Sequence, residues 1–194
     1  MAWEYLQLLP QALQALPQAT NRNTSADLCQ KWRRSALFCL DCGMRIHIGS
    51  DHAGLDFKNR IVSHLTERGH DVVDHGPHTF DPLDDYPVFC IPAAEATASE
   101  PGSLGIVLGG SGNGEQIAAN KVKGIRAALV WNEATAIAAR EHNDANVIAI
   151  GGRMHTEEEA LALVDLFLAT PFTYDERHVR RIALIAQYEE NGVI

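Results

Sequence analysis

From residue 45 onward, short apolar runs alternate with stretches in which apolar residues recur at helical spacing. The short runs fit buried strands, and the helical spacing fits one covered face of a helix. The predicted strands lie at residues 46–48, 72–73, 104–108, 126–130 and 147–150, and the predicted helices at 57–65, 86–98, 115–120, 133–141, 157–169 and 175–190. This alternation predicts an α/β fold: a Rossmann-like, doubly wound parallel five-stranded sheet in three α/β/α layers, with an extra C-terminal helix.

Residues at two helix starts and one proline inside a helix add detail. Asp85 is expected to cap the helix that begins at Tyr86, since the following Pro87 suits a first helical turn. Pro92 should kink or interrupt that helix. Thr156 is expected to cap the helix over residues 157–169.

Residues 1–43 differ from the rest of the chain, and residues 44–194 form the predicted domain. The N-terminal extension is rich in glutamine and leucine, and prolines interrupt its leucine spacing. It holds a C-x-x-C, Cys39 and Cys42, which could be half of a zinc site or a redox pair, but no second ligand pair accompanies it. One hypothesis is that Met44, directly before the first strand, is the biological start.

Composition narrows the possible partners. The formal net charge of -9 argues against a nucleic-acid binder or a protein of anionic membranes. No apolar run approaches the ~20 residues of a membrane span. Four cysteines in 194 residues do not suggest a disulfide scaffold, so cytoplasmic residence is expected. An acidic protein that handles an anionic substrate must gather its cations locally.

The chain is organised around residues 104–121, LGIVLGGSGNGEQIAANK. A strand, a glycine-rich turn and a helix start form a cradle for an anion, because the free backbone N–H groups and the helix dipole favour negative charge. Ser111 adds a hydroxyl and Glu115 a carboxylate. A base that removes a proton beside a phosphate ester explains Glu115, whereas the alternative is an ordinary first-turn acid.

Further polar residues follow the predicted strands or lie on later helices. Asp51 and His52 follow the first strand, and Arg153 follows the last. Arg177 and Arg181 are four residues apart and share one face of the C-terminal helix. They supply the local basic cluster, since arginine binds two phosphate oxygens at once. The alternative for this helix is a solvated face.

Together these residues resemble the ribose-5-phosphate isomerase B family, which also contains the galactose-6-phosphate isomerase subunits. The resemblance covers residues 44 to about 188 and rests on six motifs in order. They are GSDHAG at 49–54, DYP at 85–87, GGSGNGEQIAANK at 109–121, REHNDANV at 140–147, GGR at 151–153 and RHVRR at 177–181.

The resemblance implies interconversion of ribose 5-phosphate and ribulose 5-phosphate through an enediol, in the pentose phosphate pathway and without metal or organic cofactor. It implies a homodimer or a dimer of dimers, with each site built from two subunits. It also implies the following roles: His142 and Asp51 in ring opening; Ser111 and the backbone from Gly110 through Gly112, Asn113 and Gly114 in stabilising the enediolate; Asn143 on a sugar hydroxyl; Tyr86 in the pocket wall; and His52, Arg153, Arg177 and Arg181 on the phosphate.

One position departs from the common family pattern. Many members carry a cysteine base where this chain has Gly109. The chain instead matches a subgroup, known from actinobacteria, in which the glutamate at the position of Glu115 is the base. Cys90 is expected on the helix before the central strand, outside the glycine turn. A carboxylate that moves one proton between adjacent carbons is an established isomerase solution.

Two rival functions stay open. An allose-6-phosphate or galactose-6-phosphate isomerase would use the same residues in a roomier pocket. A non-catalytic sugar-phosphate sensor would need the cradle without the base, but the turn lacks the Lys-Ser/Thr ending of a P-loop. No metal site is expected, because no histidines have ligand-pair spacing. Trp131 is expected to pack at a strand end, and His178 has no assigned role.

Overall fold

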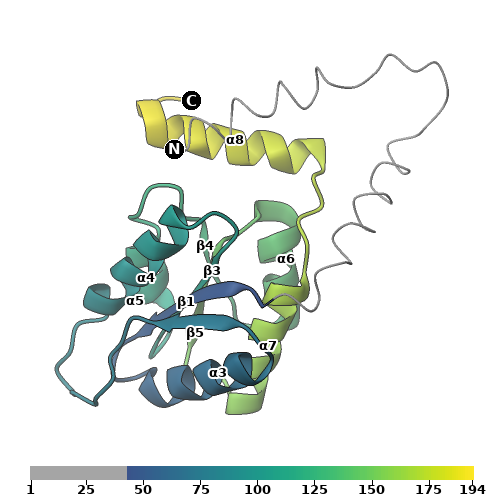
Figure 1. Cartoon of the computed structure of the whole chain (residues 1–194). Helices are drawn as coiled ribbons and strands as arrows, with labels where there is room; N and C mark the ends of the chain where they lie inside the picture. Colours follow the sequence, from purple (N-terminus) through teal and green to yellow (C-terminus); the bar gives the residue numbers. More distant parts are fainter. Residues whose placement is uncertain (1–42) are drawn as a thin grey trace, which may run out of the picture. The chain divides into compact units, whose positions relative to one another are not determined.

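The computed structural model describes residues 43–194 (Figure 1). Residues 1–42, which include Cys39, Cys42 and nearly all of the predicted N-terminal extension, lie outside the described residues. The elements are, in order, β1 (Arg45–Ser50), α3 (Leu55–Glu67), β2 (Asp71–Asp74), α4 (Pro87–Ser99), β3 (Leu104–Gly109), α5 (Asn113–Ala119), β4 (Ala127–Leu129), α6 (Glu133–Asn143), β5 (Val147–Gly151), α7 (Glu157–Ala169) and α8 (Glu176–Asn191).

The five strands form one parallel sheet in the order β2-β1-β3-β5-β4. Helices α3, α6 and α7 cover one face, and α4 and α5 cover the other (Figure 1). The doubly wound α/β prediction is therefore confirmed. The strand order reverses beside β1 and β3, which is where ligands bind in open sheets of this kind.

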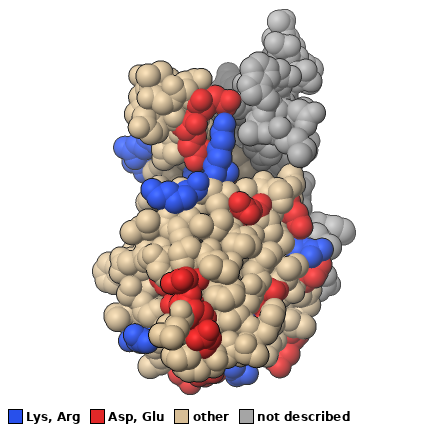
Figure 2. All heavy atoms as spheres, turned by 90° about the vertical axis from the view of Figure 1, so that its left-hand side faces the viewer, with Lys and Arg blue, Asp and Glu red and all other residues tan. Residues whose placement is uncertain are grey.

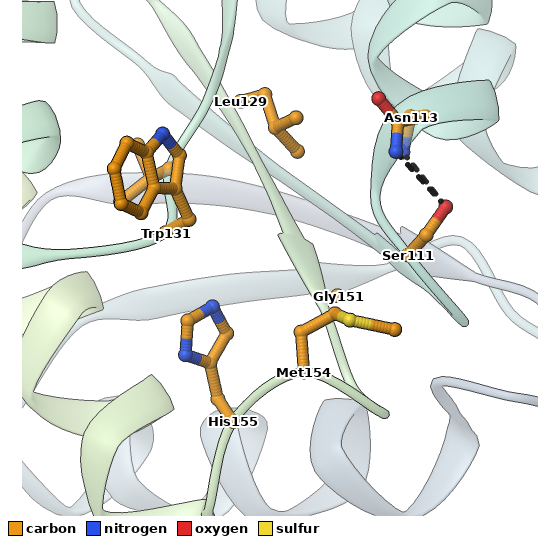
Figure 3. A pocket seen from close by; sticks show the side chains of 8 residues that line it. Ser111, Asn113, Leu129, Trp131, Gly151, Met154 and His155 are labelled. Carbon is orange, nitrogen blue, oxygen red and sulfur yellow. Dashed lines mark hydrogen bonds between the residues drawn. The ribbon is translucent and has the colours of Figure 1, made fainter.

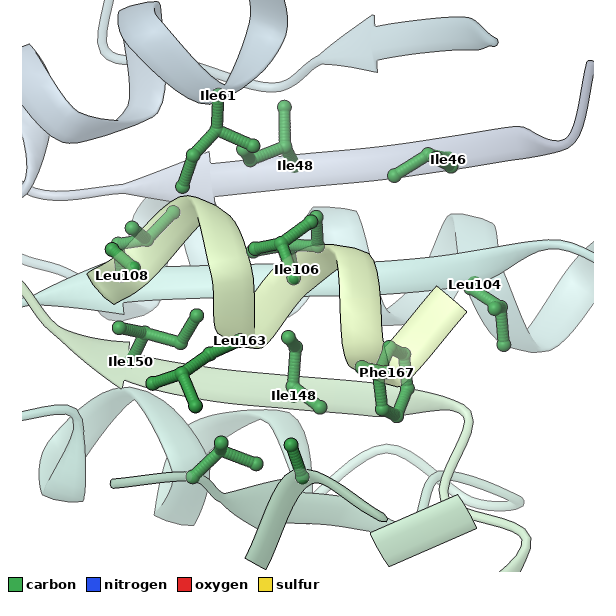
Figure 4. Close-up of a cluster of buried hydrophobic side chains, with 14 of the residues drawn as sticks. Ile46, Ile48, Ile61, Leu104, Ile106, Leu108, Ile148, Ile150, Leu163 and Phe167 are labelled. Carbon is green, nitrogen blue, oxygen red and sulfur yellow. The ribbon is translucent and has the colours of Figure 1, made fainter. Parts of the chain in front are cut away.

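The two faces of the sheet carry side chains of different size. Toward α3, α6 and α7 the strands present large residues, among them Ile48, Ile106 and Ile150, which belong to one buried cluster with Leu163 and Phe167 of α7 (Figure 4). Toward α4 and α5 the core consists largely of alanine, valine and Cys90. Because small side chains let a helix approach the sheet closely, α4 lies near the backbone that leads into the glycine turn.

Helix boundaries follow their local chemistry, with two corrections. Thr156 caps α7 through a reciprocal capping box with Glu159, as predicted. Asp85 does not cap α4; the cap position is Tyr86, which makes no side-chain cap bond. Pro92 does not interrupt α4, which runs through it from Pro87 to Ser99. The bond that Pro92 cannot make would reach the carbonyl of Val88, an exposed residue whose backbone can bind water instead.

Helix α8 stands apart from the sheet layers. Its far end contacts the turn before β4, where the Gly124 N–H donates to Glu189 and Lys123 pairs with Glu190 at 3.7 Å. Figure 2 shows acidic and basic side chains meeting where α8 faces the rest of the domain. Apolar side chains along α8 remain exposed, including Ile185 (53%) and Tyr188 (57%). Among the described helices, none is long and apolar enough to cross a membrane.

A buried and a half-buried histidine pack together near the end of α4. His47 of β1 is 1% exposed, and its Nδ1 lies 3.0 Å from Nε2 of His75. Its own Nε2 lies 3.5 Å from Glu100. Burial lowers the pKa of both histidines below the usual 6.5, and for His75 the neighbouring His47 lowers it further.

Acid should therefore destabilise the fold. Below a pH of about 6.5 the unfolded chain binds protons more readily than His47 and His75 do in the folded protein, so the free energy of unfolding rises with pH between the folded and unfolded pKa values. We expect the melting temperature to fall between about pH 7.5 and about pH 5.5. His47→Gln should make that fall smaller, and His78→Gln, at a largely exposed site, should leave it unchanged. An identical acid shift in the His47 variant would contradict this origin.

Candidate active site

The candidate site lies at the carboxyl ends of β1, β3 and β5. Ser50 pairs with Leu108, and Gly109 pairs with Gly151, so the three chains end side by side. The Gly152 N–H donates to the Gly109 carbonyl at 2.8 Å. We call the residues gathered here the strand-end cluster: Asp51, His52, Asp84, Tyr86, Gly109 to Glu115, and Arg153.

The Glu115 carboxylate lies directly over Gly109. A Cβ atom on Gly109 would overlap Oε1 and Cδ of Glu115 and lie 3.0 Å from its Cγ. Helix α5 begins at Asn113, so its first turn directs the Glu115 side chain back onto the end of β3. The carboxylate thus occupies the volume in which a side chain at position 109 would stand.

Glu115 is poised as a proton acceptor. Its residue is 4% exposed, and Oε2 is buried with no hydrogen-bond partner in the described part of the chain. Burial raises its pKa, and the negative charge of Asp51 adds to the rise. The backbone amides of Glu115 and Gly112 act in the opposite direction. A carboxyl with a raised pKa both takes up and returns protons more readily near neutral pH.

Asp51 and Cys90 complete the surroundings of Glu115. Asp51 is buried, and one of its oxygens accepts from the N–H groups of Ala53 and Gly54, so its carboxylate is held in place. Cys90 lies on α4, as predicted, and is fully buried. Burial raises the pKa of its thiol far above neutral, and Glu115 and Asp51 raise it further. Cys90 therefore remains a thiol and is no rival base.

The glycine turn requires glycine at position 112. Gly112 has a φ of 81°, and a Cβ there would lie 2.7 Å from Leu129 and 3.1 Å from the Gly151 nitrogen. Ser111 precedes it, and its hydroxyl accepts from the side-chain amide of Asn113 at 3.3 Å. The tight turn leaves Ser111 exposed at the cluster's edge.

A cavity of about 350 Å³ opens beside this turn. Ser111 and Asn113 lie on one side of it and Trp131 and His155 on the other (Figure 3). Trp131 is 62% exposed, so the packing expected for it at the strand end is not made within the described chain. Glu115 is not among the lining residues, which places the cavity next to the carboxylate's own site.

Three more predicted residues join the strand-end cluster. His52 donates its backbone N–H to Asp84 Oδ1 at 3.0 Å, and its Nδ1 lies 2.7 Å from the same oxygen. Tyr86 packs against Gly114, where a Cβ would lie 3.0 Å from the phenol oxygen. The Arg153 guanidinium stands over Gly110, and the Arg153 N–H donates to the Gly110 carbonyl at 3.1 Å.

One set of residues in this cluster has the arrangement of a metal site. Ligand atoms of Asp51, His52 and Asp84 all lie within 4.8 Å of one another, the one such group among the described residues. Backbone N–H groups already occupy Asp51, and Asp84 already binds His52.

The remaining predicted residues, together with His178, form a second group, the α6–α8 cluster: His142, Asn143, Arg177, His178 and Arg181. The His142 and His178 rings stack, with centroids 4.5 Å apart and planes at 12°. Arg177 Nε donates to His178 Nε2 at 3.3 Å. His178 is 4% exposed, and burial together with the charge of Arg177 lowers its pKa. Asn143 donates to the Ala138 carbonyl at 3.2 Å.

The two clusters are separate within one chain. No hydrogen bond, ion pair or ring contact between residues 43 and 194 joins a member of one cluster to a member of the other. The base and the glycine turn belong to the first cluster, and the paired arginines belong to the second. An active site that needs residues of both clusters therefore cannot be formed by the contacts seen within one chain.

Comparison with known proteins settles the family. A sequence model described as Ribose/Galactose Isomerase matches residues 46–185. This chain belongs to the ribose/galactose isomerase family. The ribose-5-phosphate isomerase B of Mycobacterium tuberculosis H37Rv is 60% identical over 147 residues, which are 76% of this chain and 91% of the relative. The probable ribose-5-phosphate isomerase B of Mycoplasma pneumoniae is 44% identical over 144 residues, 74% of this chain and 94% of the relative.

Solved structures of ribose-5-phosphate isomerases B have the same fold as this chain. The ribose-5-phosphate isomerase B of Mycoplasma genitalium, solved with bound ribulose 5-phosphate, superposes with a TM-score of 0.74 at 44% identity, covering 76% of this chain and 97% of that one. The enzyme of Clostridium thermocellum superposes with a TM-score of 0.73 at 44% identity, covering 77% and 99%. The family resemblance read from the motifs is therefore confirmed.

Two members of the clusters escaped sequence reasoning. His178 stacks on His142, although only its place between two arginines marked it in the sequence. Asp84 binds His52 from 32 residues away, and in the sequence it is one of several acids in a polar loop. A sequence pattern reports neighbours along the chain, whereas both of these contacts join distant segments.

Proposed function

We propose that this protein is a ribose-5-phosphate isomerase, which interconverts D-ribose 5-phosphate and D-ribulose 5-phosphate in the non-oxidative pentose phosphate pathway. The observation that carries the proposal is the buried Glu115 carboxylate over Gly109, beside the glycine turn. Relatives named ribose-5-phosphate isomerase B at 60% identity support it. We also propose that the protein acts in the cytoplasm, as expected for a pathway of phosphorylated sugars.

The proposed chemistry follows from the position of Glu115. In the open-chain aldose, Glu115 removes the proton from C2, the C–H electrons form the C1–C2 double bond, and O1 takes up charge and a proton. Glu115 then returns a proton to C1, while O2 loses its proton and becomes the ketose carbonyl. Ser111 and the backbone N–H groups of the glycine turn stabilise the enediolate oxygen, a role in which fixed donors lower the barrier.

Ring opening and phosphate binding are assigned to the remaining residues. His142 with Asp51 opens the furanose, and Asn143 holds a sugar hydroxyl. The phosphate is held by His52, Arg153, Arg177 and Arg181. None of these steps calls for a metal or organic cofactor, so we expect a chelator to leave turnover unchanged.

We propose a homodimer or a dimer of dimers in which each site draws on two subunits. Two observations support this. The strand-end cluster and the α6–α8 cluster do not meet within the described residues of one chain, and α8 leaves Ile185 and Tyr188 exposed. Exposed apolar side chains along one helix are typical of a surface that a partner covers. No nucleic-acid or membrane partner is proposed.

Mixed dimers test the shared site. When Glu115→Gln and His142→Ala subunits are combined, one of the two sites carries both changes and the other carries neither. Co-expression should therefore restore about a quarter of the wild-type activity, since about half of the dimers are mixed and each has one intact site. Each variant alone should be nearly inactive. A mixture no more active than its components would place both residues in the same subunit's site.

A turnover assay tests the function itself. Ribose 5-phosphate and allose 6-phosphate should be compared side by side, with and without chelator, because a hexose isomerase would use the same catalytic residues. We expect a higher kcat/KM for ribose 5-phosphate. Preference for the hexose would reassign the substrate, and binding of both sugars without turnover would indicate a sensor.

A further inference from the structure

We propose that Asp84 is a positioning residue that holds His52 with its Nε2 turned toward the substrate phosphate. The inference rests on the phosphate-binding role proposed for His52. Asp84 Oδ1 accepts from two groups of that residue, the backbone N–H at 3.0 Å and the ring Nδ1 at 2.7 Å. Because one oxygen binds both the main chain and the ring, it fixes the backbone of the turn after β1 and the ring's orientation together.

Low solvent exposure and a ring contact restrict the side chains of Asp84 and His52. The Asp84 side chain is 8% exposed and that of His52 is 24% exposed, so water competes little for their contact. The Phe80 ring meets the His52 ring edge-on, with centroids 5.9 Å apart and planes at 86°. These contacts leave few alternative orientations for the His52 ring.

The loop that carries Asp84 is itself ordered by hydrogen bonds. The Asp84 N–H donates to the Asp81 carbonyl at 3.2 Å, and the Leu83 N–H donates to the Asp81 carboxylate at 3.0 Å. This turn delivers Asp84 to His52 just before Tyr86, which packs on the glycine turn. One loop therefore places the partner of His52 and a wall of the site.

The chemistry of the pair specifies what His52 can do. A carboxylate at Nδ1 keeps a proton on that nitrogen, which leaves Nε2 as the free atom of the ring. When Nε2 is protonated, the imidazolium offers a charge-assisted N–H to a phosphate oxygen. Asp84 Oδ2 is buried and has no hydrogen-bond partner in the described part of the chain. Within the described part of the chain, the His52 ring is the one side chain with which the Asp84 carboxylate forms a hydrogen bond or ion pair.

Two Asp84 variants with a neighbouring control test the proposal. Asp84→Ala should raise KM for ribose 5-phosphate, and the inhibition constant of inorganic phosphate, by about 10- to 100-fold, with kcat within about threefold. Asp84→Asn keeps an oxygen that can accept both bonds and should show a smaller rise. Asp85→Ala removes the same charge from the next residue, which is exposed, and should change neither constant.

A spectroscopic readout separates positioning from general stability. Long-range ¹H–¹⁵N correlation of the His52 ring should report a protonated Nδ1 in the wild type and in Asp84→Asn, and loss of that signature in Asp84→Ala. Unchanged constants and an unchanged ring signature in Asp84→Ala would overturn the proposal. So would a loss confined to kcat. Phosphate binding and the ring signature are read without turnover, so an inactive wild-type protein would overturn the proposed function and leave this inference to its own test.

Discussion

Replacing Glu115 with glutamine should lower kcat for ribose 5-phosphate by about 10²–10⁴, because a positioned general base contributes that much to proton transfer. The amide has nearly the shape of the carboxylate and can still accept from the backbone, so the fold and the glycine turn should persist. We expect the melting temperature and the binding of an inert phosphosugar analogue to stay close to wild type. Steady-state kinetics with calorimetric binding would measure both.

The control for this variant is Glu158→Gln, a change at an exposed first-turn glutamate of α7. It should leave kcat unchanged. Thiol reagents provide a second control, since burial raises the pKa of Cys90 and suppresses its thiolate. Near-normal turnover by Glu115→Gln, or full inactivation on alkylation of Cys90 alone in a protein that remains folded, would remove Glu115 from the role of base.

Gly109→Ala should be nearly as damaging as Glu115→Gln. The added methyl group would overlap the Glu115 carboxylate and must push it away from the reacting carbons. A misplaced base loses rate steeply, because proton transfer needs hydrogen-bond reach. We expect kcat to fall by about 10²-fold or more while the backbone of the turn is retained, since Gly109 has no left-handed φ. Kinetics and thermal melting of the variant would check this.

A double variant tests whether a base at position 109 can replace the Glu115 carboxylate. Gly109→Cys with Glu115→Ala places a thiol where the carboxylate stands, as in family members with a cysteine base. It should be more active than Gly109→Ala with Glu115→Ala, which has the space and no base. Wild-type kcat in Gly109→Ala would mean that the carboxylate does not need its position over residue 109.

The layered fold could be predicted because the strands obey simple rules. Ile46 and Ile48 alternate with His47, and Leu104 to Leu108 form a continuous buried run, as a central parallel strand does. Pro92 does not interrupt α4, and the reason is local. Proline disrupts a helix by removing one hydrogen bond, and here the unpaired carbonyl belongs to the exposed Val88. Whether the carbonyl that loses its helical hydrogen bond lies at the surface or in the core depends on tertiary packing, which the sequence does not show.

The site could be predicted residue by residue, but its grouping could not. The motifs name Glu115 and Ser111 as well as His142 and Arg177, and nothing in their order reveals that they fall into two clusters within one chain. The approach of Glu115 to Gly109 depends on the angle at which α5 leaves β3. The His52–Asp84 bond depends on the path of a ten-residue polar loop, 76–85, whose composition specifies no single conformation.

The most direct test of the central claim is solvent-hydrogen exchange at C1 of ribulose 5-phosphate in D₂O, followed by NMR with the wild-type protein and with Glu115→Gln. The ketose cannot close a furanose ring through its phosphorylated oxygen, so the experiment isolates proton transfer from ring opening. We expect deuterium at C1 with the wild-type protein and its near absence with the folded, analogue-binding Glu115→Gln protein. Exchange at the wild-type rate in that variant would contradict the assignment of Glu115 as the base of an enediol isomerisation.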